Sequence, residues 1–377
     1  MAIPYSRQLI DRSDISAVCK VLKSDFLTTG PQVNNFEKKL ENFFGSKYAS
    51  VVNSATSALH LACLALDLTT KDTVWTTPIS FVASSNCAIY CGAKVDFVDI
   101  NEKTFNLCEE KLEYKLKNTP KNKLPAIVIV VHLSGHPVNL KKIKNLSKKY
   151  KFKIIEDASH AVGSVYQKNL IGNCKFSDVC IFSFHPIKII TTGEGGALLT
   201  NSKNIFKKFS LLRSHGIDKS VKSNDNPWYY DQVSLGYNYR MNEIEAALGT
   251  SQLIKLNKFV SERNKIAKIY KLNLNLKNIK YQHLIENCKS SMHLFIIRVS
   301  ASKRMLIYNE LKKNKIYTNL HYIPIYRHSF YKQYKIKYEN FKNAEQYYKE
   351  AISIPLYCGL KKRTQMKIIK IINKLTT

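Results

Sequence analysis

The chain has 377 residues, of which 45% are apolar and 23% are charged. This length and composition can bury a sizeable core in two or three domains and exclude a disordered or fibrous protein. The first twenty residues lack the uninterrupted apolar segment of a signal peptide, and the longest apolar run, at 124–133, is about half of what a bilayer crossing needs. We therefore expect a soluble cytoplasmic protein.

Basic residues outnumber acidic residues by 59 to 28, which gives a net charge of +31. Such an excess attracts polyanions, so a non-enzymatic nucleic-acid binder is one hypothesis. However, only nine of the basic residues are arginines, and the lysines are spread over helix-like segments such as 141–153. No helix-turn-helix, zinc-finger, RRM or KH signature accompanies them. We interpret the lysines as solvated helix faces and expect no nucleic-acid partner.

The nine cysteines form an odd number with no CxxC pair and no His/Cys ligand spacing. This pattern favours neither a disulfide framework nor a zinc site. Cys87 and Cys91 lie one helical turn apart, but two ligands without a nearby third make no metal site. We expect most cysteines to be small core residues and expect no bound metal.

Helix-like and strand-like segments alternate along the first two thirds of the chain. Residues 31–45 begin with proline, repeat apolar residues at helical spacing and end on glycine, which predicts a helix. A short strand is expected at 46–53 and a helix that opens on serine at 54–68. Further strands are predicted at 94–100, 126–133, 152–158 and 179–184. This alternation predicts an α/β fold with a mostly parallel sheet, whose site lies at the carboxyl ends of the strands.

The last third of the chain has a different pattern. A long helical period at 242–272 suggests a bridge to a second domain, and the segments that follow are typical of a smaller α+β unit. We predict a large domain over 1–245 and a small C-terminal domain over 246–377.

Two segments place reactive side chains where a predicted strand ends. One strand ends with Glu156 and Asp157, and His160 follows. A carboxylate buried there would need a cationic partner, and the alternative is a helix N-cap. After another strand, Ser183 and Lys188 precede a glycine cluster, for which the alternative is a glycine turn with an exposed lysine.

A third segment, 53–62, offers Ser54, Thr56, Ser57 and free backbone N–H groups at a helix start. These groups suit a phosphate, although an ordinary capped helix has the same pattern. Together, the three segments require a ligand with a phosphate, a ring nitrogen that pairs with an aspartate and an aldehyde that reacts with a lysine. Pyridoxal 5′-phosphate has all three groups.

Six segments match one known family in chain order: LTTGPQVNNFE (27–37), NSATSALHLA (53–62), TTPISFVASSNC (76–87), IIEDASHAVGS (154–164), FSFHPIKIITTGEGG (182–196) and GYNYRMNEIEAALG (236–249). From about residue 4 to its end, the chain resembles the pyridoxal phosphate-dependent, fold-type I aminotransferases of the DegT/DnrJ/EryC1 family, which act on nucleotide-linked keto sugars. The resemblance implies a large domain with a mostly parallel seven-stranded sheet, a smaller α+β C-terminal domain and a homodimer with shared active sites.

The resemblance also implies catalytic and cofactor-binding residues. Lys188 would bind the cofactor aldehyde and carry a proton, and Asp157 would pair with the ring nitrogen. The other implied cofactor contacts come from the matched segments: Thr56, Ser57, Phe81, His160, Ser183 and Asn238. Of these, Asn238 would contact the cofactor of the neighbouring subunit. For Phe81 the alternative is a core phenylalanine, and for His160 it is a structural histidine.

Substrate contacts are implied as well. Arg240 would bind the carboxylate of the amino donor, with a structural salt bridge as the alternative. The contacts to the sugar or its diphosphate are expected near the N-terminus and in the segment TNLHYIPIY: Thr28, Thr29, Gly30, His321 and Tyr322.

The sequences of segments 54–62 and 182–196 are similar to those of family members that act in bacterial pseudaminic acid biosynthesis. This similarity implies transfer of an amino group from L-glutamate to C4 of a UDP-linked 4-keto-6-deoxy-N-acetylhexosamine, in two half-reactions with ping-pong kinetics. Another nucleotide-linked 3- or 4-keto sugar is the nearest alternative. A sugar dehydratase of the same fold is less favoured, because those relatives have histidine where this chain has Lys188.

Overall fold

The computed structural model describes residues 2–218, 226 and 228–377. Its helices are α1 (Arg12–Leu22), α2 (Pro31–Phe44), α3 (Ala55–Ala65), α4 (Ala83–Tyr90), α5 (Glu109–Lys117), α6 (Leu140–Tyr150), α7 (Lys203–Leu212), α8 (Glu243–Ile254), α9 (Leu256–Asn273), α10 (Ala301–Lys313), α11 (Lys342–Glu350) and α12 (Lys362–Thr376). Its strands are β1 (Tyr48–Val52), β2 (Thr73–Thr76), β3 (Lys94–Phe97), β4 (Ile127–Val131), β5 (Lys153–Asp157), β6 (Val165–Tyr166), β7 (Asn169–Leu170), β8 (Val179–Ser183), β9 (Gly196–Thr200), β10 (Ile217–Asp218), β11 (Asp231–Gln232), β12 (Lys280–Tyr281), β13 (Cys288–Lys289), β14 (Phe295–Arg298) and β15 (Ala351–Ile354).

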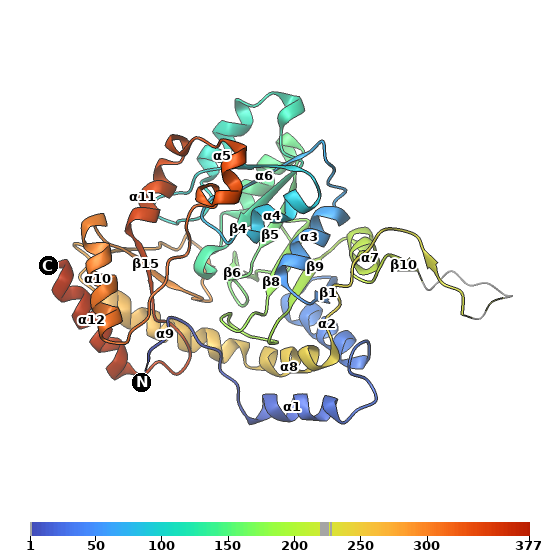
Figure 1. The fold of residues 1–377 in the computed structure, drawn as a ribbon, viewed down its shortest axis with the longest axis horizontal. Helices are drawn as coiled ribbons and strands as arrows, with labels where there is room; N and C mark the ends of the chain where they lie inside the picture. Colours follow the sequence, from blue (N-terminus) through green and yellow to red (C-terminus); the bar gives the residue numbers. More distant parts are fainter. Residues whose placement is uncertain (1, 219–225, 227) are drawn as a thin grey trace.

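A seven-stranded sheet forms the centre of the molecule, in the order β1-β9-β8-β5-β4-β2-β3 (Figure 1). The pairs β2–β3, β2–β4, β4–β5 and β5–β8 are parallel, and β9 runs antiparallel to both β8 and β1. The predicted α/β fold with a mostly parallel sheet is therefore confirmed.

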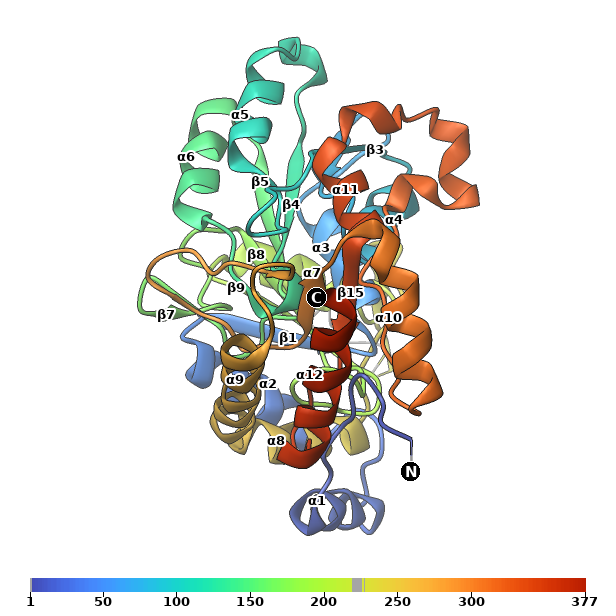
Figure 2. The same cartoon turned by 90° about the vertical axis from the view of Figure 1, so that its left-hand side faces the viewer.

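Helices cover both faces of this sheet, as the alternating pattern requires (Figure 2). Alternate strand residues such as Ile155 and Ile181 pack with α3, α4 and α7 on one face. Their neighbours in sequence, such as Ile154 and Phe182, pack with α2, α5, α6 and α8 on the other. Because side chains alternate along a strand, two consecutive residues at a strand end point to opposite faces.

The local signals in the sequence explain the two helices nearest the site. Pro31 occupies the first turn of α2, and Gly45 ends it in the left-handed conformation with φ of 75°. Ser54 caps α3 by accepting a hydrogen bond from the Ser57 N–H at 3.1 Å. These caps fix the position at which β1 turns into α3.

The predicted bridge at 242–272 consists of two helices, not one. Lys255 separates α8 from α9; α8 packs against α1 and α2, whereas α9 packs against α12. A second sheet, β12-β14-β15, packs its apolar side chains with those of α9, α10 and α12. This arrangement supports a division between two domains close to α8, and the boundary at 245/246 itself stays a prediction.

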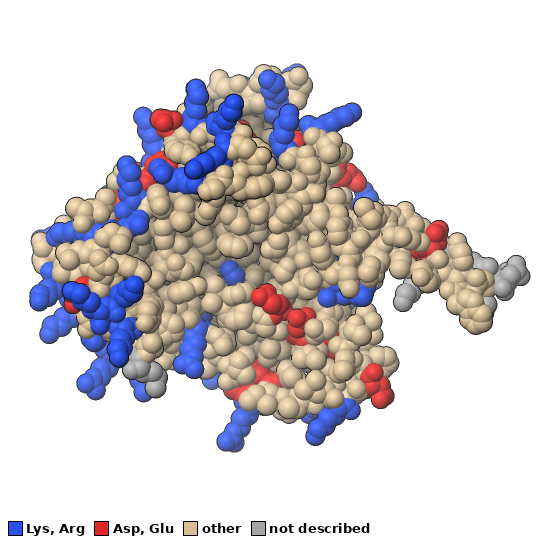
Figure 3. Space-filling view, viewed as in Figure 1, with Lys and Arg blue, Asp and Glu red and all other residues tan. Residues whose placement is uncertain are grey.

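Within the described part of the chain, no helix combines the length and the apolar character needed to cross a bilayer. On the face drawn in Figure 3, lysine and arginine side chains lie mostly around the edge of the molecule, and a group of acidic side chains lies near its centre. The basic side chains on this face therefore do not form one continuous patch across it.

Candidate active site

A cavity of about 630 Å³ lies at the carboxyl ends of the parallel strands. Val131, Asp157 and Ser183 are the last residues of β4, β5 and β8, and all three line it. The start of α3, the loop before α4 and a segment after α10 complete the wall. Eight of the predicted site residues line this cavity: Thr56, Phe81, Asp157, His160, Ser183, Lys188, His321 and Tyr322.

Asp157 presents a buried carboxylate, 5% exposed, to this cavity. Its Oδ2 accepts a hydrogen bond from Ser84 Oγ at 2.6 Å, and its Oδ1 accepts from Ser159 Oγ at 2.6 Å and Ser159 N at 3.1 Å. Among the described residues no cation lies within ion-pair distance of it. A buried carboxylate without a cation fits a protonated ring nitrogen.

Lys188 follows β8 in a turn, where its backbone N–H donates to the His185 carbonyl at 2.9 Å. Its side chain lines the cavity, and within the described residues its Nζ has no hydrogen-bond or ion-pair partner. Burial lowers the pKa of Lys188 to about 8, and the Asp157 charge opposes that shift. An amine with this pKa is available in neutral form for reaction with an aldehyde.

The glycine cluster after Lys188 lets two backbones meet. A Cβ at Gly196 would lie 2.5 Å from the Ala55 nitrogen, so only glycine allows β9 to approach the start of α3 this closely. The alternative of an exposed lysine on a glycine turn does not describe this segment, because Lys188 lies within the cavity wall.

The N-terminus of α3 faces the same cavity. Ser54, Ala55 and Thr56 line it, and in the described residues the N–H groups of Ala55 and Thr56 have no acceptor. The Ser57 hydroxyl is not part of the wall; it donates to Asn53 Oδ1 at 2.7 Å. Unpaired N–H groups at a helix start fit a phosphate, so this end of the cavity fits the third group of the cofactor.

Phe81 is 57% exposed although it lies in a loop between two buried elements. Its ring lies 6.2 Å from the Tyr322 ring across the cavity. The alternative of a core phenylalanine is therefore wrong. An aromatic face open to the cavity fits an aromatic ligand ring.

His160 is buried at the cavity wall, and both of its ring nitrogens have partners. Its Nδ1 accepts from the Ser134 N–H at 3.3 Å, so the hydrogen on Nε2 points at the Tyr322 hydroxyl, 3.1 Å away. Burial, and then the nearby Lys188 charge, hold the pKa of His160 well below its usual value. The His293 ring lies behind it at 4.4 Å. These contacts agree with the structural alternative, and a ring contact to the cofactor stays a prediction.

Six predicted residues, Ser57 among them, do not line the cavity. Gly30 is the N-cap of α2 and donates its N–H to Glu243 Oε1 at 3.0 Å. Arg240 donates to Ser214 Oγ at 3.3 Å and forms no ion pair with the described residues. The six are Thr28, Thr29, Gly30, Ser57, Asn238 and Arg240. Their roles stay predictions, and for Asn238 the prediction concerns the neighbouring subunit.

The structure adds site residues that the sequence reasoning missed. Ser84 and Ser159 hold Asp157, and both lie inside matched segments, so their spacing to the aspartate was an available signal. His185 and Glu194 also line the wall and lie inside the matched segment 182–196, and Asn319 lies in the segment TNLHYIPIY, whereas Tyr5 and His328 carried no local signal. Tyr5 and Asn319 come from opposite ends of the chain, and only the fold brings them together.

Residues 8–373 match the DegT/DnrJ/EryC1/StrS aminotransferase family. A Campylobacter jejuni protein named UDP-4-amino-4,6-dideoxy-N-acetyl-beta-L-altrosamine transaminase is 41% identical over 364 residues, which are 94% of this chain and 92% of the relative.

Two solved structures are similar over nearly their whole length. Helicobacter pylori PseC, described as an aminotransferase involved in the biosynthesis of pseudoaminic acid, has a TM-score of 0.91 and 34% identity, over 100% of this chain and 99% of its own. A putative sugar aminotransferase from Streptococcus pneumoniae in its PLP form has a TM-score of 0.91 and 28% identity, over 100% and 99%.

The match extends over almost the entire chain, and the cavity holds a group for each part of the expected cofactor. It favours an enzyme over the nucleic-acid binder that the charge suggested. The chain belongs to the DegT/DnrJ/EryC1/StrS family of aminotransferases, which depend on pyridoxal 5′-phosphate and act on nucleotide sugars with an amino donor.

Proposed function

We propose that this enzyme transfers the amino group of L-glutamate to C4 of a UDP-linked 4-keto-6-deoxy-N-acetylhexosamine, as in pseudaminic acid biosynthesis. The observation that carries the proposal is the unpaired Lys188 amine opposite the buried Asp157 carboxylate in one cavity. The Campylobacter jejuni relative, 41% identical and named as an altrosamine transaminase, supports this choice of sugar.

We propose that three groups hold the cofactor. Asp157 would pair with its ring nitrogen, Phe81 would cover one face of its ring, and the N–H groups at the start of α3, with Thr56 and Ser183, would bind its phosphate. Ser57 would contribute as part of the helix N-terminus that faces the phosphate, because its hydroxyl donates a hydrogen bond to Asn53. When bound, pyridoxal phosphate supplies a ring that withdraws electrons from the carbon that loses a proton.

The Nζ atom of Lys188 would have two roles. The neutral Nζ would hold the aldehyde of the cofactor, and as a free amine the same Nζ would carry a proton between the substrate carbon and the cofactor. A pKa of about 8 suits both, because the amine is then partly neutral at physiological pH and still accepts a proton. His321 and Tyr322, on the opposite wall, would contact the sugar or its diphosphate.

We further propose a homodimer in which each subunit completes the site of the other. Strands β10 and β11 lie at one side of the molecule (Figure 1), and the described residues 228–235 carry strongly exposed apolar side chains, among them Trp228 at 82% and Leu235 at 79%. Such side chains favour burial against another surface. Asn238 and Arg240 follow this segment, from where they would reach the partner's phosphate and the donor carboxylate.

A mixing experiment tests the shared site. Lys188→Ala and Asn238→Ala chains, each inactive alone, are co-expressed in equal amounts. Because half of the subunit pairs are then mixed and each mixed pair has one intact site, about a quarter of the wild-type activity should return. No recovery from two stable chains would contradict the shared site.

The substrate is tested with the purified holoenzyme, L-glutamate and a panel of 4-keto UDP- and dTDP-sugars. Mass spectrometry should find the 4-amino product from the UDP-linked N-acetyl sugar, together with 2-oxoglutarate. Amination of a different 3- or 4-keto sugar, with the expected one untouched, would replace the substrate and keep the aminotransferase.

A further inference from the structure

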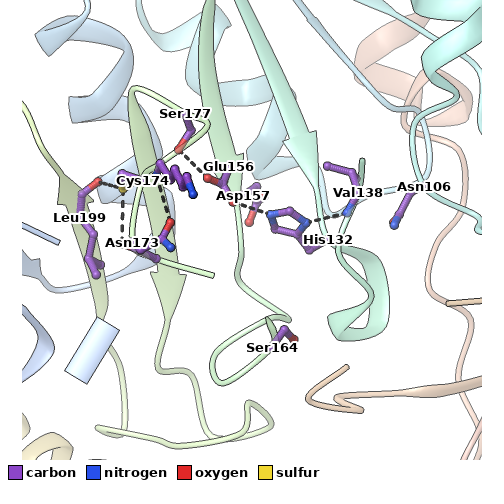
Figure 4. Close-up of polar contacts among 12 residues, drawn as sticks. Asn106, His132, Val138, Glu156, Asp157, Ser164, Asn173, Cys174, Ser177 and Leu199 are labelled. Carbon is purple, nitrogen blue, oxygen red and sulfur yellow. Dashed lines mark hydrogen bonds and ion pairs between the residues drawn. The ribbon is translucent and has the colours of Figure 1, made fainter. Parts of the chain in front are cut away.

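Two consecutive carboxylates end β5 and point to opposite faces of the sheet. Asp157 faces the cavity, whereas Glu156 lies on the face covered by α5 and α6 and is only 2% exposed. Within the described residues Glu156 forms no ion pair with a lysine or an arginine. The ionisable side chain in contact with its carboxylate is that of His132. Figure 4 shows this group of buried side chains beside the strand end.

His132 contacts Glu156 in a defined orientation. Val138 N–H donates to His132 Nδ1 at 3.1 Å, so the ring hydrogen is on Nε2 and points at Glu156 Oε2, 2.9 Å away (Figure 4). Ser177 Oγ donates to the other carboxylate oxygen. Both oxygens of Glu156 are thereby satisfied, and the carboxylate holds the imidazole in one tautomer.

The same histidine holds the residues that face the cofactor site. Its backbone N–H donates to the Asp157 carbonyl at 3.2 Å. The turn that follows it runs to Ser134, whose N–H donates to His160 Nδ1 at 3.3 Å. His132 therefore joins Glu156 on one face of the sheet to Asp157 and His160 on the other.

We infer that His132 and Glu156 form a positioning pair that fixes the Asp157 carboxylate and the His160 ring for the cofactor, without touching it. A buried ionisable group that loses its partner is costly, so the pair resists any shift of the β5 end relative to β4. A residue that does not touch a ligand can still affect the affinity for that ligand, because it orients the side chains that do touch it. This inference rests on the proposed cofactor site.

The test uses the apoprotein and pyridoxamine 5′-phosphate, which has the ring nitrogen and phosphate but no aldehyde. Its dissociation constant, measured by fluorescence titration, reports on Asp157 and the phosphate site without the covalent bond to Lys188. His132→Asn keeps an acceptor for Val138 N–H and removes the bond to Glu156, whereas His132→Gln keeps a donor for Glu156. We expect His132→Asn to raise the constant by about tenfold and His132→Gln by clearly less.

A matched control separates positioning from stability. Asp14 is a fully buried carboxylate outside the cavity that accepts from Gln252 and Ser251 and pairs with Lys255. Asp14→Asn should lower the midpoint temperature of thermal unfolding of the apoprotein and leave the dissociation constant for pyridoxamine 5′-phosphate unchanged. An equal loss of affinity in Asp14→Asn and His132→Asn would overturn the inference. A dissociation constant within about twofold of the wild-type value in a folded His132→Asn protein would also overturn it.

A second variant covers the case in which His132→Asn does not fold. Ser177→Ala removes only the other donor to Glu156 and should raise the constant by a few-fold; an unchanged constant would overturn the inference. If the wild-type apoprotein does not bind pyridoxamine 5′-phosphate, the proposed cofactor site fails together with the inference. Normal binding by wild type and by His132→Asn overturns the positioning pair alone.

Discussion

Lys188 and Asp157 line one cavity at the ends of two adjacent parallel strands, and the Asp157 carboxylate influences the pKa of the Lys188 amine. Asp157 ends β5 and Lys188 lies in the turn after β8. Burial lowers the pKa of the amine to about 8, and the carboxylate limits that shift. The site thus combines an amine that is partly neutral at physiological pH with a buried carboxylate.

The first prediction concerns pH. The rate at which the apoprotein binds pyridoxal phosphate covalently should rise with pH through a midpoint near 8, because only the neutral Lys188 amine reacts. In Asp157→Asn the midpoint should move to lower pH, since the charge that favours the ammonium form is gone. Stopped-flow absorbance measures both. A midpoint near the ordinary lysine value of 10.5 would contradict the burial effect.

Lys188→Ala should remove turnover completely. Borohydride treatment of the loaded wild-type enzyme, followed by peptide mapping, should find the cofactor attached to the peptide that contains Lys188. The exposed Lys203 supplies the control: Lys203→Ala should keep full activity and the same labelled peptide. A label on any other lysine would refute the assignment.

Asp157→Asn should slow both half-reactions by on the order of 100-fold, because it removes the charge opposite the ring nitrogen. The fold should be largely kept, since asparagine still accepts from Ser159. Ser84→Ala removes one hydrogen bond to the same carboxylate and should cost only about fivefold. Single-turnover absorbance changes with glutamate measure the first half-reaction. Equal rates in Asp157→Asn and wild type would mean that another group pairs with the nitrogen.

Phe81→Ala should separate binding from stability. Phe81 is more than half exposed, so its loss should cost less than about 1 kcal/mol of unfolding free energy while weakening cofactor binding. Phe36 is fully buried, and Phe36→Ala should cost about 3–5 kcal/mol. Urea unfolding of the apoproteins and cofactor titration give the two quantities. Unchanged affinity in Phe81→Ala would exclude a stacking role.

Cys91 should be the most reactive thiol of the described residues. A hydrogen bond from Cys63, and to a lesser degree the His60 ring, lower the pKa of the half-exposed Cys91 to about 6, although burial acts against them. At pH 7 iodoacetamide should therefore modify Cys91 before the exposed Cys19. Peptide mass spectrometry at short times measures the order. His60→Ala should slow the reaction at Cys91 only, and faster labelling of Cys19 in the wild type would contradict the expectation.

Most of the strands and helices around the site could be predicted from sequence. The Ser54 cap, the Pro31 start and the Gly45 end are local signals, and each is found where the sequence indicates it. The break at Lys255 was not predicted, because the apolar period continues through it. Packing of α8 on α1 and α2, and of α9 on α12, decides that break.

The sequence by itself determined the α/β fold and the family, and it predicted that Lys188 and Asp157 share one site, because motif spacing and strand ends are encoded within short segments. Only the tertiary structure decided which side chains share the cavity. The ring of Phe81 is exposed, both nitrogens of His160 have hydrogen-bond partners, and Tyr5 and Asn319 line the same cavity. The physical reason is that exposure and hydrogen-bond partners depend on residues far apart in the chain, which meet only after the two sheets pack together.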